Sequence, residues 1–496
     1  MERYALVFRG HRFGYEVQAI AKLFLPGVRF LLCEDGQPEP EAEYCLLTQI
    51  TPTGDALTLL CRAVLPEGAR ESVQTQPTAL SGNALEKALC TQLYLLLREM
   101  TGYTPPWGML TGIRPVRMIT QAVQQGCTPE AACARMREEY LVSEEKLRLA
   151  LETARVQLPI LPHAQEEIGL YVSIPFCPTR CSYCSFVSHS MDSARALIPA
   201  YVEKLCEELA VLGNIIRERG LIVQSVYIGG GTPTSLTALQ LRQVMEAVAE
   251  HIPLTHAREY TVEAGRADTI TREKLSVIRQ MGATRISVNP QTLQDSVLEV
   301  IGRRHTAQQA VRAYETAREM GFDDINMDLI AGLPTDTFEG FADTLSRVMA
   351  LSPDSITVHT LTRKRAADLY TAQGLTGVQE VSAMAKLAAD RLPQAGWRPY
   401  YLYRQKNTIG NLENVGYARP GKENLYNILI MDETQTILAA GCAASTKVVK
   451  NGQITRVMNY KFPYEYIGRF DQLMEKKQEI LRALDAGGRS AGEDRT

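Results

Sequence analysis

From residue 171 onward, short apolar runs alternate with longer stretches in which apolar residues recur at helical spacing. Short apolar segments bounded by glycine or polar residues are typical of buried strands, and the longer stretches are typical of helices that cover a sheet. The predicted strands cover residues 171–175, 225–229, 259–264, 285–289, 326–331 and 355–361. The predicted helices cover residues 194–216, 239–251, 271–282, 307–321 and 338–351. This alternation predicts a parallel sheet built from βα units.

Right-handed crossovers curl such a series into an open doubly wound sheet or into a barrel. Either form is an α/β fold, and with six units the barrel would be a partial (β/α)6 barrel. At roughly 150 residues per domain, the 496 residues suggest about three domains. We expect an N-terminal α/β domain of unknown role (1–163), the barrel (164–375), a C-terminal α+β region that closes it (376–486) and a disordered tail (487–496).

The flanking regions are less regular. Strands are predicted at 4–7, 28–33, 44–50 and 56–64 and a helix at 84–100, followed by a charged helix at 138–156. After the barrel, a helix is predicted at 380–396, a strand running into a glycine-bearing turn at 434–447, and a long amphipathic helix at 464–486.

Charge and composition exclude some classes of protein. Lys and Arg number 53 against 56 Asp and Glu, so the net charge of −3 favours neither nucleic acid nor an anionic membrane. No apolar run approaches the roughly 20 residues of a membrane span, and none follows Met1 as in a secretory signal. We expect a cytoplasmic protein that acts as a monomer.

Three of the eleven cysteines lie in CPTRCSYC, directly after the first predicted barrel strand: Cys177, Cys181 and Cys184. A disulfide with a spare cysteine, or half of a zinc site, are alternative interpretations. The other cysteines are scattered among apolar residues, and no second pair lies nearby to complete a zinc site. Three thiolates on one short loop favour an iron–sulfur cluster with one iron left open to a small molecule.

Other polar residues and glycines also follow the predicted strands. Parallel sheets and barrels place their sites at the carboxyl ends of strands. GGGTPT (229–234) follows the second strand, and its glycines would let the backbone approach a ligand closely. Glu263 and Asp328 fall near strand ends and need partners, for which ligand hydroxyls or Arg303 would serve.

The segments GLYVSIPFCPTRCSYC, VYIGGGTPT, YTVEAGRAD, RISVNPQT and NMDLIAGLP together resemble the radical S-adenosylmethionine (SAM) enzymes, specifically the oxygen-independent coproporphyrinogen III oxidase (coproporphyrinogen dehydrogenase) family. The similarity is greatest to its HemZ-like branch, which carries an extra N-terminal domain. It covers residues 165–365 in motif detail.

The resemblance implies that Cys177, Cys181 and Cys184 hold a [4Fe–4S] cluster whose fourth iron binds SAM. It further implies that Tyr171, Gly230 and Glu263 contact this SAM. A second SAM would be held by Tyr183, Gly231, Thr232, Gln291, Arg303, Asp328 and Thr362. The family also has a GxG-type turn near the first SAM, where this chain has Gly441 and Ala443.

The implied reaction is oxidative decarboxylation of two propionates of coproporphyrinogen III to vinyl groups in haem biosynthesis. It would use a 5′-deoxyadenosyl radical and an unidentified electron donor. A tetrapyrrole with four carboxylates suits the arginines and lysine near the mouth, and Tyr400, Tyr401 and Tyr403 with Arg404 and Lys406 suit stacking and ion pairing. The mouth cations are Arg303, Arg304, Arg363, Lys364 and Arg365.

One departure keeps a second function open. Ser185 and Phe186 follow Cys184, whereas the family's oxidases carry a fourth cysteine two positions after the third. Cys-x-Phe also occurs in related haem chaperones, which bind haem and need not decarboxylate it. A radical methyltransferase is a third class, without a positive feature in this sequence.

Overall fold

The computed structural model describes residues 3–37, 40–112, 114–162, 164–184, 186, 188–362, 377–405 and 408–486. The tail expected at 487–496 lies outside the described residues, as do Ser185, Arg363, Lys364, Arg365 and Lys406. Among the described residues, no helix combines the length and the apolar character needed to span a bilayer.

The chain divides into two compact units. The smaller comprises Met1–Pro115, Gln121–Leu151 and Arg404–Leu412, and the larger comprises Val116–Thr120, Glu152–Tyr403 and Glu413–Thr496. Every residue predicted to belong to the cofactor site falls in the larger unit.

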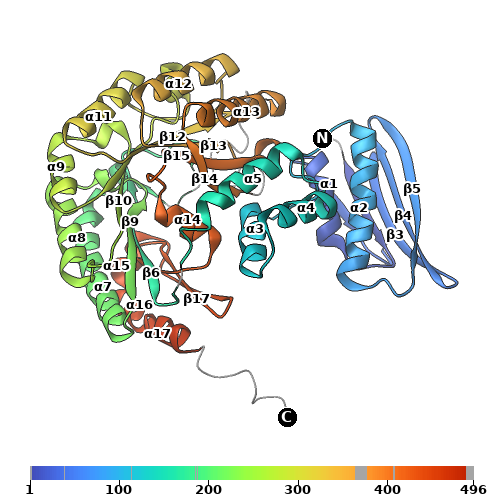
Figure 1. Ribbon diagram of the computed structural model, residues 1–496, viewed down its shortest axis with the longest axis horizontal. Coiled ribbons are helices and arrows are strands. Elements are labelled where there is room, and N and C mark those ends of the chain that lie inside the picture. The colour runs from blue at the N-terminus through green and yellow to red at the C-terminus, as the bar shows by residue number, and fades with distance from the viewer. Residues whose placement is uncertain are drawn as a thin grey trace, which may run out of the picture. The chain divides into compact units, whose positions relative to one another are not determined.

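Six parallel strands of the larger unit lie side by side in chain order (Figure 1). They are β6 (Glu167–Ile174), β9 (Ile222–Gly230), β10 (Glu259–Gly265), β11 (Arg285–Val288), β12 (Ile325–Ala331) and β13 (Ser355–Thr360). Helices line the outer side of the curved sheet in Figure 1. They are α7 (Ile198–Glu218), α8 (Ala238–His251), α9 (Arg272–Gln280), α11 (Ala307–Glu319) and α12 (Phe338–Leu351). The prediction of a partial (β/α)6 barrel is confirmed.

The C-terminal region extends this sheet at both edges. Beyond β13 lie β15 (Glu413–Ala418), antiparallel to it, and β14 (Arg398–Arg404). Beyond β6 lie β16 (Thr436–Ala440), parallel to it, and the antiparallel β17 (Ser445–Lys450) and β18 (Gln453–Met458). Within the described part of the chain, β14 and β18 are the two edges of this sheet, so the strands do not pair into a closed ring.

Apolar side chains at paired register positions cover one face of the central strands. Val172, Ile228, Val262, Ile286 and Leu329 are all fully buried. The other face carries Tyr171, Tyr227, Glu263, Ser287 and Asp328, so apolar residues alternate with polar or tyrosine positions along these strands. Each of the buried apolar side chains contributes roughly 1.5–3 kcal/mol on burial.

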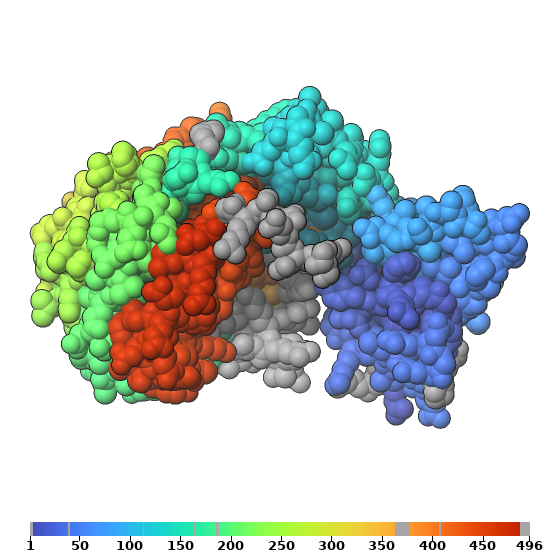
Figure 2. All heavy atoms as spheres, turned by 90° about the horizontal axis from the view of Figure 1, so that it is seen from below, coloured from blue at the N-terminus to red at the C-terminus, as the bar shows by residue number. Residues whose placement is uncertain are grey.

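The remaining helices of the larger unit differ from expectation in one place. They are α6 (Met191–Ala194), α10 (Asp295–Val300), α13 (Val378–Gln394), α14 (Leu425–Asp432), α15 (Pro463–Gly468), α16 (Phe470–Lys476) and α17 (Gln478–Asp485). The single helix expected at 464–486 is wrong, because the chain breaks at Arg469, whose φ of −121° is not helical, and again at Lys477. Of the resulting short helices, α15 and α16 pack against α7, and α17 packs against β17 and β18. Figure 2 shows this C-terminal segment in red beside the green part of the chain.

The smaller unit contains a five-stranded sheet in the order β2-β1-β3-β4-β5. Its strands are β1 (Tyr4–Arg9), β2 (Phe30–Cys33), β3 (Tyr44–Thr53), β4 (Ala56–Leu65) and β5 (Gly68–Pro77). The helices from this part of the chain are α1 (Gly14–Phe24), α2 (Gly82–Thr101), α3 (Pro115–Gln124), α4 (Pro129–Tyr140) and α5 (Glu144–Gln157). The charged helix expected at 138–156 is wrong in its first residues, because Leu141 adopts a φ of 56° and ends α4.

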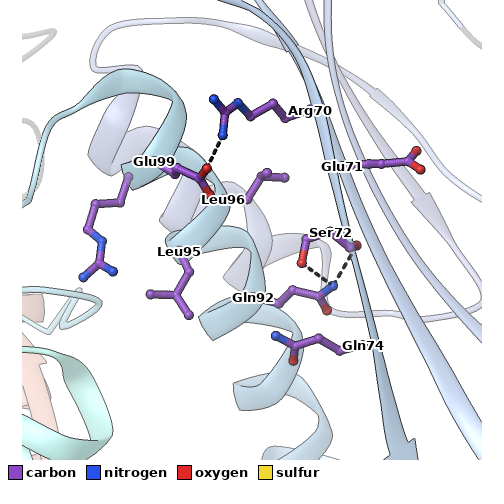
Figure 3. Close-up of a pocket in the computed structure, with 9 residues that line it drawn as sticks. Arg70, Glu71, Ser72, Gln74, Gln92, Leu95, Leu96 and Glu99 are labelled. Atoms are coloured by element: carbon purple, nitrogen blue, oxygen red, sulfur yellow. Dashed lines mark hydrogen bonds and ion pairs between the residues drawn. The ribbon is translucent and has the colours of Figure 1, made fainter.

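Helix α1 and strand β5 were not predicted from the sequence. Strand β5 (GARESVQTQP) is a polar, largely exposed edge strand and therefore lacks an apolar face that a pattern could reveal. A polar pocket lies between β5 and α2 (Figure 3). There Arg70 pairs with Glu99, and the Gln92 amide donates to Ser72 Oγ and O at 3.1 and 2.8 Å.

A buried ion pair ties the C-terminal helices to α7. Glu208 and Lys477 are 0% and 1% exposed, and Lys477 Nζ lies 2.5 Å from Glu208 Oε1. Glu208 also accepts hydrogen bonds from Tyr466 Oη at 2.6 Å, Asn459 Nδ2 at 2.8 Å and Gly441 N at 2.7 Å. The carboxylate thus joins α7 to α15 and to the turn after β16.

We expect Glu208→Gln to reduce the free energy of unfolding by roughly 3–5 kcal/mol, because it leaves the Lys477 ammonium buried without a counter-charge. Glu207→Gln, the same change one residue earlier in an exposed pair with Lys204, should cost less than about 1 kcal/mol. Urea unfolding of both variants measures the difference. Equal losses of unfolding free energy in the two variants would contradict the role of Glu208 in holding the C-terminal helices to α7, here called the Glu208 anchor.

Candidate functional site

The three cysteines lie on the loop that follows β6. Cys177 ends the short strand β7 (Phe176–Cys177), which pairs with β8 (His189–Ser190) and so closes the base of the loop. The rest of the loop is tied to the end of α10, since Ser182 N donates to Ile301 O at 3.2 Å and Thr179 Oγ1 donates to Gly302 O at 3.0 Å. These contacts fix the path of the loop at the carboxyl end of β6.

Each cysteine sulfur accepts a hydrogen bond from a neighbouring donor. Cys177 Sγ accepts from Thr232 Oγ1 at 3.5 Å and from the Ser188 side chain. Cys181 Sγ lies 3.6 Å from Arg266 Nη1, and Cys184 accepts from the backbone of Phe186. Donors aimed at sulfur are the surroundings that stabilise metal-bound thiolates.

This donor set fits an iron–sulfur cluster. Burial raises the pKa of Cys177, and raises the pKa of Cys184 to about 11, so the thiols hold protons that metal binding would displace. Within the ranges that the structure describes, no three His, Cys, Asp or Glu residues are grouped as ligands of a single metal ion. In a [4Fe–4S] cluster each thiolate binds a different iron.

The glycines after β9 provide room beside the loop. Gly231 N donates to Ile174 O at 2.7 Å, and Thr232 N donates to Phe176 O at 2.7 Å. A Cβ at Gly231 would lie 2.7 Å from Phe176 O and 3.0 Å from Cys177 Sγ. Gly230 has a φ of 112°, which side-chain-bearing residues rarely adopt. Glycine is therefore required here for two strand ends to meet at the cluster loop.

Glu263, at the end of β10, lies beside a stack of tyrosines. It accepts a hydrogen bond from the Tyr227 hydroxyl. Burial, and to a lesser extent the charge of Asp328, raises the pKa of Glu263 to about 7. The ring of Tyr426 stacks on Tyr227 with centroids 4.4 Å apart, and Tyr171 stacks on both at 6.0–6.2 Å.

The sheet and α14 position this tyrosine stack. Tyr171 and Tyr227 come from the adjacent strands β6 and β9 at paired register positions. Tyr426 comes from the start of α14, where buried Glu259 accepts from Leu425 N at 2.7 Å and Tyr426 N at 3.1 Å. A carboxylate at a helix N-terminus satisfies its free amides and fixes the helix direction.

Asp328 on β12 and His359 on β13 form a second polar group. Asp328 Oδ2 lies 3.7 Å from His359 Nε2, and its Oδ1 accepts from Asn326 Nδ2 at 2.7 Å. The Tyr403 hydroxyl lies 3.4 Å from His359 Nδ1. Although burial favours its neutral form, the hydrogen bond and charge of His359 lower the pKa of Asp328.

Arg303 contacts the cluster loop rather than the two carboxylates. Its guanidinium donates to Tyr183 Oη at 3.0 Å and to Asn289 O at 2.6 Å. The suggestion that Arg303 would pair with Glu263 or Asp328 is therefore wrong. The partner of Glu263 is the Tyr227 hydroxyl, and the partners of Asp328 are the Asn326 amide and the His359 imidazole. Gln291 lies nearby with a φ of 69°, and its backbone N donates to the backbone carbonyl of Asp328 at 2.9 Å.

Several buried polar atoms in this region have no protein hydrogen-bond partner. They are Ser287 Oγ on β11, Asn289 Oδ1 and Gln291 Oε1 directly after β11, and Arg303 Nε after α10. Burying a polar atom without a hydrogen-bond partner costs about 1–3 kcal/mol. Several such atoms close together therefore indicate that a polar ligand binds there and supplies the missing partners.

The remaining candidates have different surroundings. Thr362 Oγ1 donates to Thr360 O at 3.4 Å, and Arg304 is exposed. Tyr400 and Tyr401 are 1% and 5% exposed, so they serve the core rather than a stacking surface. Arg404 is 6% exposed and donates to the carbonyls of Leu110, Gly112 and Asn411, so the expectation that it pairs with substrate carboxylates is wrong.

Comparison with known proteins agrees with this geometry. The Radical SAM superfamily profile matches residues 171–348. The chain is 40% identical over 408 residues to the oxygen-independent coproporphyrinogen-III oxidase-like protein HemZ of Bacillus subtilis (strain 168), covering 80% of this chain and 81% of that protein. The chain belongs to the radical SAM oxygen-independent coproporphyrinogen III oxidase family, in its HemZ-like branch.

The family contains proteins with different names. The heme chaperone HemW of Bacillus subtilis (strain 168) is 27% identical over 308 residues, covering 59% of this chain and 77% of that protein. Coproporphyrinogen III oxidase (HemN) from Escherichia coli, a radical SAM enzyme of known structure, shares the fold with a TM-score of 0.52 and 24% identity, covering 65% of this chain and 73% of that one. Radical SAM proteins use a [4Fe–4S] cluster and SAM, and this chain carries the three cysteines.

Sequence reasoning missed four residues that shape the site. Tyr227, Tyr426, Arg266 and Ser188 contact Glu263, its tyrosine stack or the cysteine sulfurs. Tyr227 lies in VYIGGGTPT and Arg266 lies in YTVEAGRAD. Their positions near the ends of predicted strands could have indicated that they belong to the site. Tyr426 lies 199 positions after Tyr227 by difference of their numbers, so only the fold brings the two together.

We predict that Gly231→Ala lowers the iron content of the reconstituted protein several-fold, because the added methyl would crowd Cys177 Sγ and the Phe176 carbonyl. Gly468→Ala is the matched control, since a Cβ there meets no atom within 4 Å. Iron and sulfide assays after anaerobic reconstitution give the measurement. An unchanged iron content in Gly231→Ala would refute the close approach.

The raised pKa of Glu263 predicts a pH-dependent stability. The folded protein holds this proton up to about pH 7, whereas the unfolded chain releases it at a carboxyl's ordinary pKa. The stability that Glu263 contributes is therefore full below the unfolded-state pKa and is lost as the pH rises through about 7, by on the order of 3 kcal/mol.

Glu263→Gln should remove this dependence, so the variant should be more stable than the parent at pH 8 and similar at pH 5. Glu246→Gln, an exposed carboxylate 57% accessible on α8, should leave the pH profile unchanged. Urea unfolding at several pH values tests both. Parallel profiles for parent and Glu263→Gln would count against the assignment.

Proposed function

We propose that this protein catalyses the oxygen-independent oxidative decarboxylation of two propionates of coproporphyrinogen III to vinyl groups, which yields protoporphyrinogen IX. The observation that carries the proposal is the cysteine loop whose three sulfurs each accept a hydrogen bond, placed beside a glycine turn and buried polar atoms without protein partners. Family membership supports it, since the named relatives include an oxidase-like protein.

In this proposal Cys177, Cys181 and Cys184 would hold the [4Fe–4S] cluster, and the iron without a cysteine ligand would be open to SAM. Tyr171, Gly230 and Glu263 contact the SAM bound there. The bound cluster and SAM together supply a 5′-deoxyadenosyl radical that can remove a hydrogen atom from an unactivated carbon. Each propionate then loses that hydrogen atom, carbon dioxide and one electron, which passes to an acceptor.

The chain's own residues orient the ligands and keep water out. Glu263 offers a carboxylate acceptor above about pH 7, and the three stacked tyrosines form an aromatic wall behind it. Asp328, in contact with His359, offers a charged acceptor at the same end of the sheet. Phenols whose pKa is raised by burial, such as Tyr227, stay neutral and donate hydrogen bonds.

A second SAM is also proposed. Its contacts would be Tyr183, Gly231, Thr232, Gln291, Arg303, Asp328 and Thr362. Arg303 has an Nε without a protein acceptor, and Gln291 has an Oε1 without a protein donor. These two atoms are suited to a ligand that carries both a carboxylate and an amino group.

Haem binding without turnover is the alternative function. It is favoured by Phe186, which follows the cysteine loop and is 68% exposed, and by similarity to heme chaperones. An exposed aromatic ring beside a cluster loop offers a face on which a planar macrocycle could stack. The two functions differ in turnover, so one experiment separates them.

The test is anaerobic incubation of the reconstituted, dithionite-reduced protein with SAM and coproporphyrinogen III, with 5′-deoxyadenosine and oxidised porphyrin products followed by chromatography. We expect both products to form together in the parent protein. Cys181→Ser should abolish both, and Cys206→Ser, the same change at a partly buried cysteine on α7, should retain both. Absence of product with stoichiometric haem binding would favour the chaperone function.

A further inference from the structure

We propose that Arg266 sets the reduction potential of the cluster through its hydrogen bond to Cys181 Sγ, and so acts as a positioning and tuning residue of the site. This inference rests on the proposed function, because it requires that Cys181 bind the cluster. Arg266 was not among the residues expected from the sequence to contact the cofactors.

The guanidinium is aimed at the cluster loop by a carboxylate on its other side. Arg266 Nε donates to Asp268 Oδ1 at 3.0 Å and Nη2 donates to Asp268 Oδ2 at 2.7 Å. This two-point pairing occupies one edge of the planar fork and fixes its orientation. The remaining nitrogen, Nη1, points to the loop, where it donates to Thr179 Oγ1 at 2.8 Å, to Thr179 O at 3.2 Å and to Cys181 Sγ at 3.6 Å.

The local backbone holds Arg266 in this place. It follows β10 directly, its N donates to Ala264 O at 2.7 Å, and its carbonyl accepts from Thr269 N at 3.0 Å. The side chain is 4% exposed. The link from β10 to the loop is therefore a buried, rigid one.

The charges around Arg266 are arranged to favour a positive group beside Cys181. His305 Nδ1 lies 3.6 Å from Asp268 Oδ1, and burial lowers the pKa of His305. The neutral imidazole therefore leaves Arg266 as the main cation on Asp268. Although burial opposes it, the neighbouring His305 imidazole and the hydrogen bonds and charge of Arg266 lower the pKa of Asp268, so the carboxylate stays ionised.

Of the hydrogen bonds to the three cysteine sulfurs given above for the described residues, that of Arg266 comes from a charged donor, and the others come from hydroxyls and a backbone amide. A buried positive charge stabilises a reduced cluster more than an oxidised one, because reduction adds one negative charge. In a low-dielectric interior this effect is large, whereas solvent screens it at the surface. Arg266 should therefore raise the cluster's potential and ease reduction by a weak donor.

The test is an EPR-monitored redox titration of the reconstituted full-length protein. In Arg266→Gln we expect the equilibrium constant for one-electron reduction to fall roughly tenfold, which corresponds to about 59 mV. Arg266→Lys keeps the charge and should shift the potential by less than half as much. Arg180→Gln removes an equal but exposed charge from the same loop and should change the potential little.

The outcomes separate an electronic role from a structural one. Equal shifts in Arg266→Gln and Arg266→Lys, or a shift in Arg266→Gln no larger than in Arg180→Gln, would overturn the proposal. If both variants take up no cluster, a structural role replaces the proposal. If only Arg266→Gln takes up none, the potential of Arg266→Lys decides, and a shift from the parent of more than about 30 mV, half of the 59 mV expected for Arg266→Gln, would overturn the proposal. A parent protein that binds no [4Fe–4S] cluster, judged by iron content and EPR, would instead reject the proposed function.

Discussion

The close approach of two backbone segments underlies the whole site. The end of β6 and the turn after β9 meet through hydrogen bonds from Gly231 N to Ile174 O and from Thr232 N to Phe176 O. The two segments are so close that a Cβ at position 231 would clash with Phe176 O and Cys177 Sγ. Glycine at this position therefore lets the start of the cysteine loop lie against the turn after β9. Parallel pairing from Glu167 to Ile174 sets this meeting point, because each pair along the strand fixes the next.

The polar groups gather because the sheet brings them together, since they are remote in sequence. Glu263, Asp328 and His359 come from three strands, and Tyr426 from a helix that a buried Glu259 caps. In a parallel sheet all strands end at one edge, so short loops there can carry chemistry while the apolar strands supply the stability. Arg266 and Asp268 follow the same rule from the end of β10.

Much of this could be anticipated from the sequence, for a physical reason. Each central strand has one apolar face and is bounded by glycine or polar residues, which made β6, β9 and the other central strands visible. The cysteine spacing and GGGTPT were visible because metal binding and close backbone approach restrict residue type. Tyr426, Arg266 and Glu208 could not be found, because their roles depend on long-range contacts. The edge strand β5 was missed because its exposed polar residues form no apolar pattern. The helix break at Lys477 was missed because a buried lysine looks like a surface residue in the sequence.

The Glu208 anchor has a consequence for how the protein matures. Its carboxylate on α7 needs Lys477, Tyr466, Asn459 and the amide of Gly441, all more than 230 residues later by difference of their numbers, and β16 must pair with β6 at similar separation. A nascent chain released from the ribosome only as far as β13 would hold the cysteine loop while a charged carboxylate and one edge of the sheet remained unpaired. Contacts of such long range form late in folding. Loading of iron and sulfide is therefore expected to follow synthesis of the chain at least to Lys477, so that the cluster is assembled after these long-range contacts have formed.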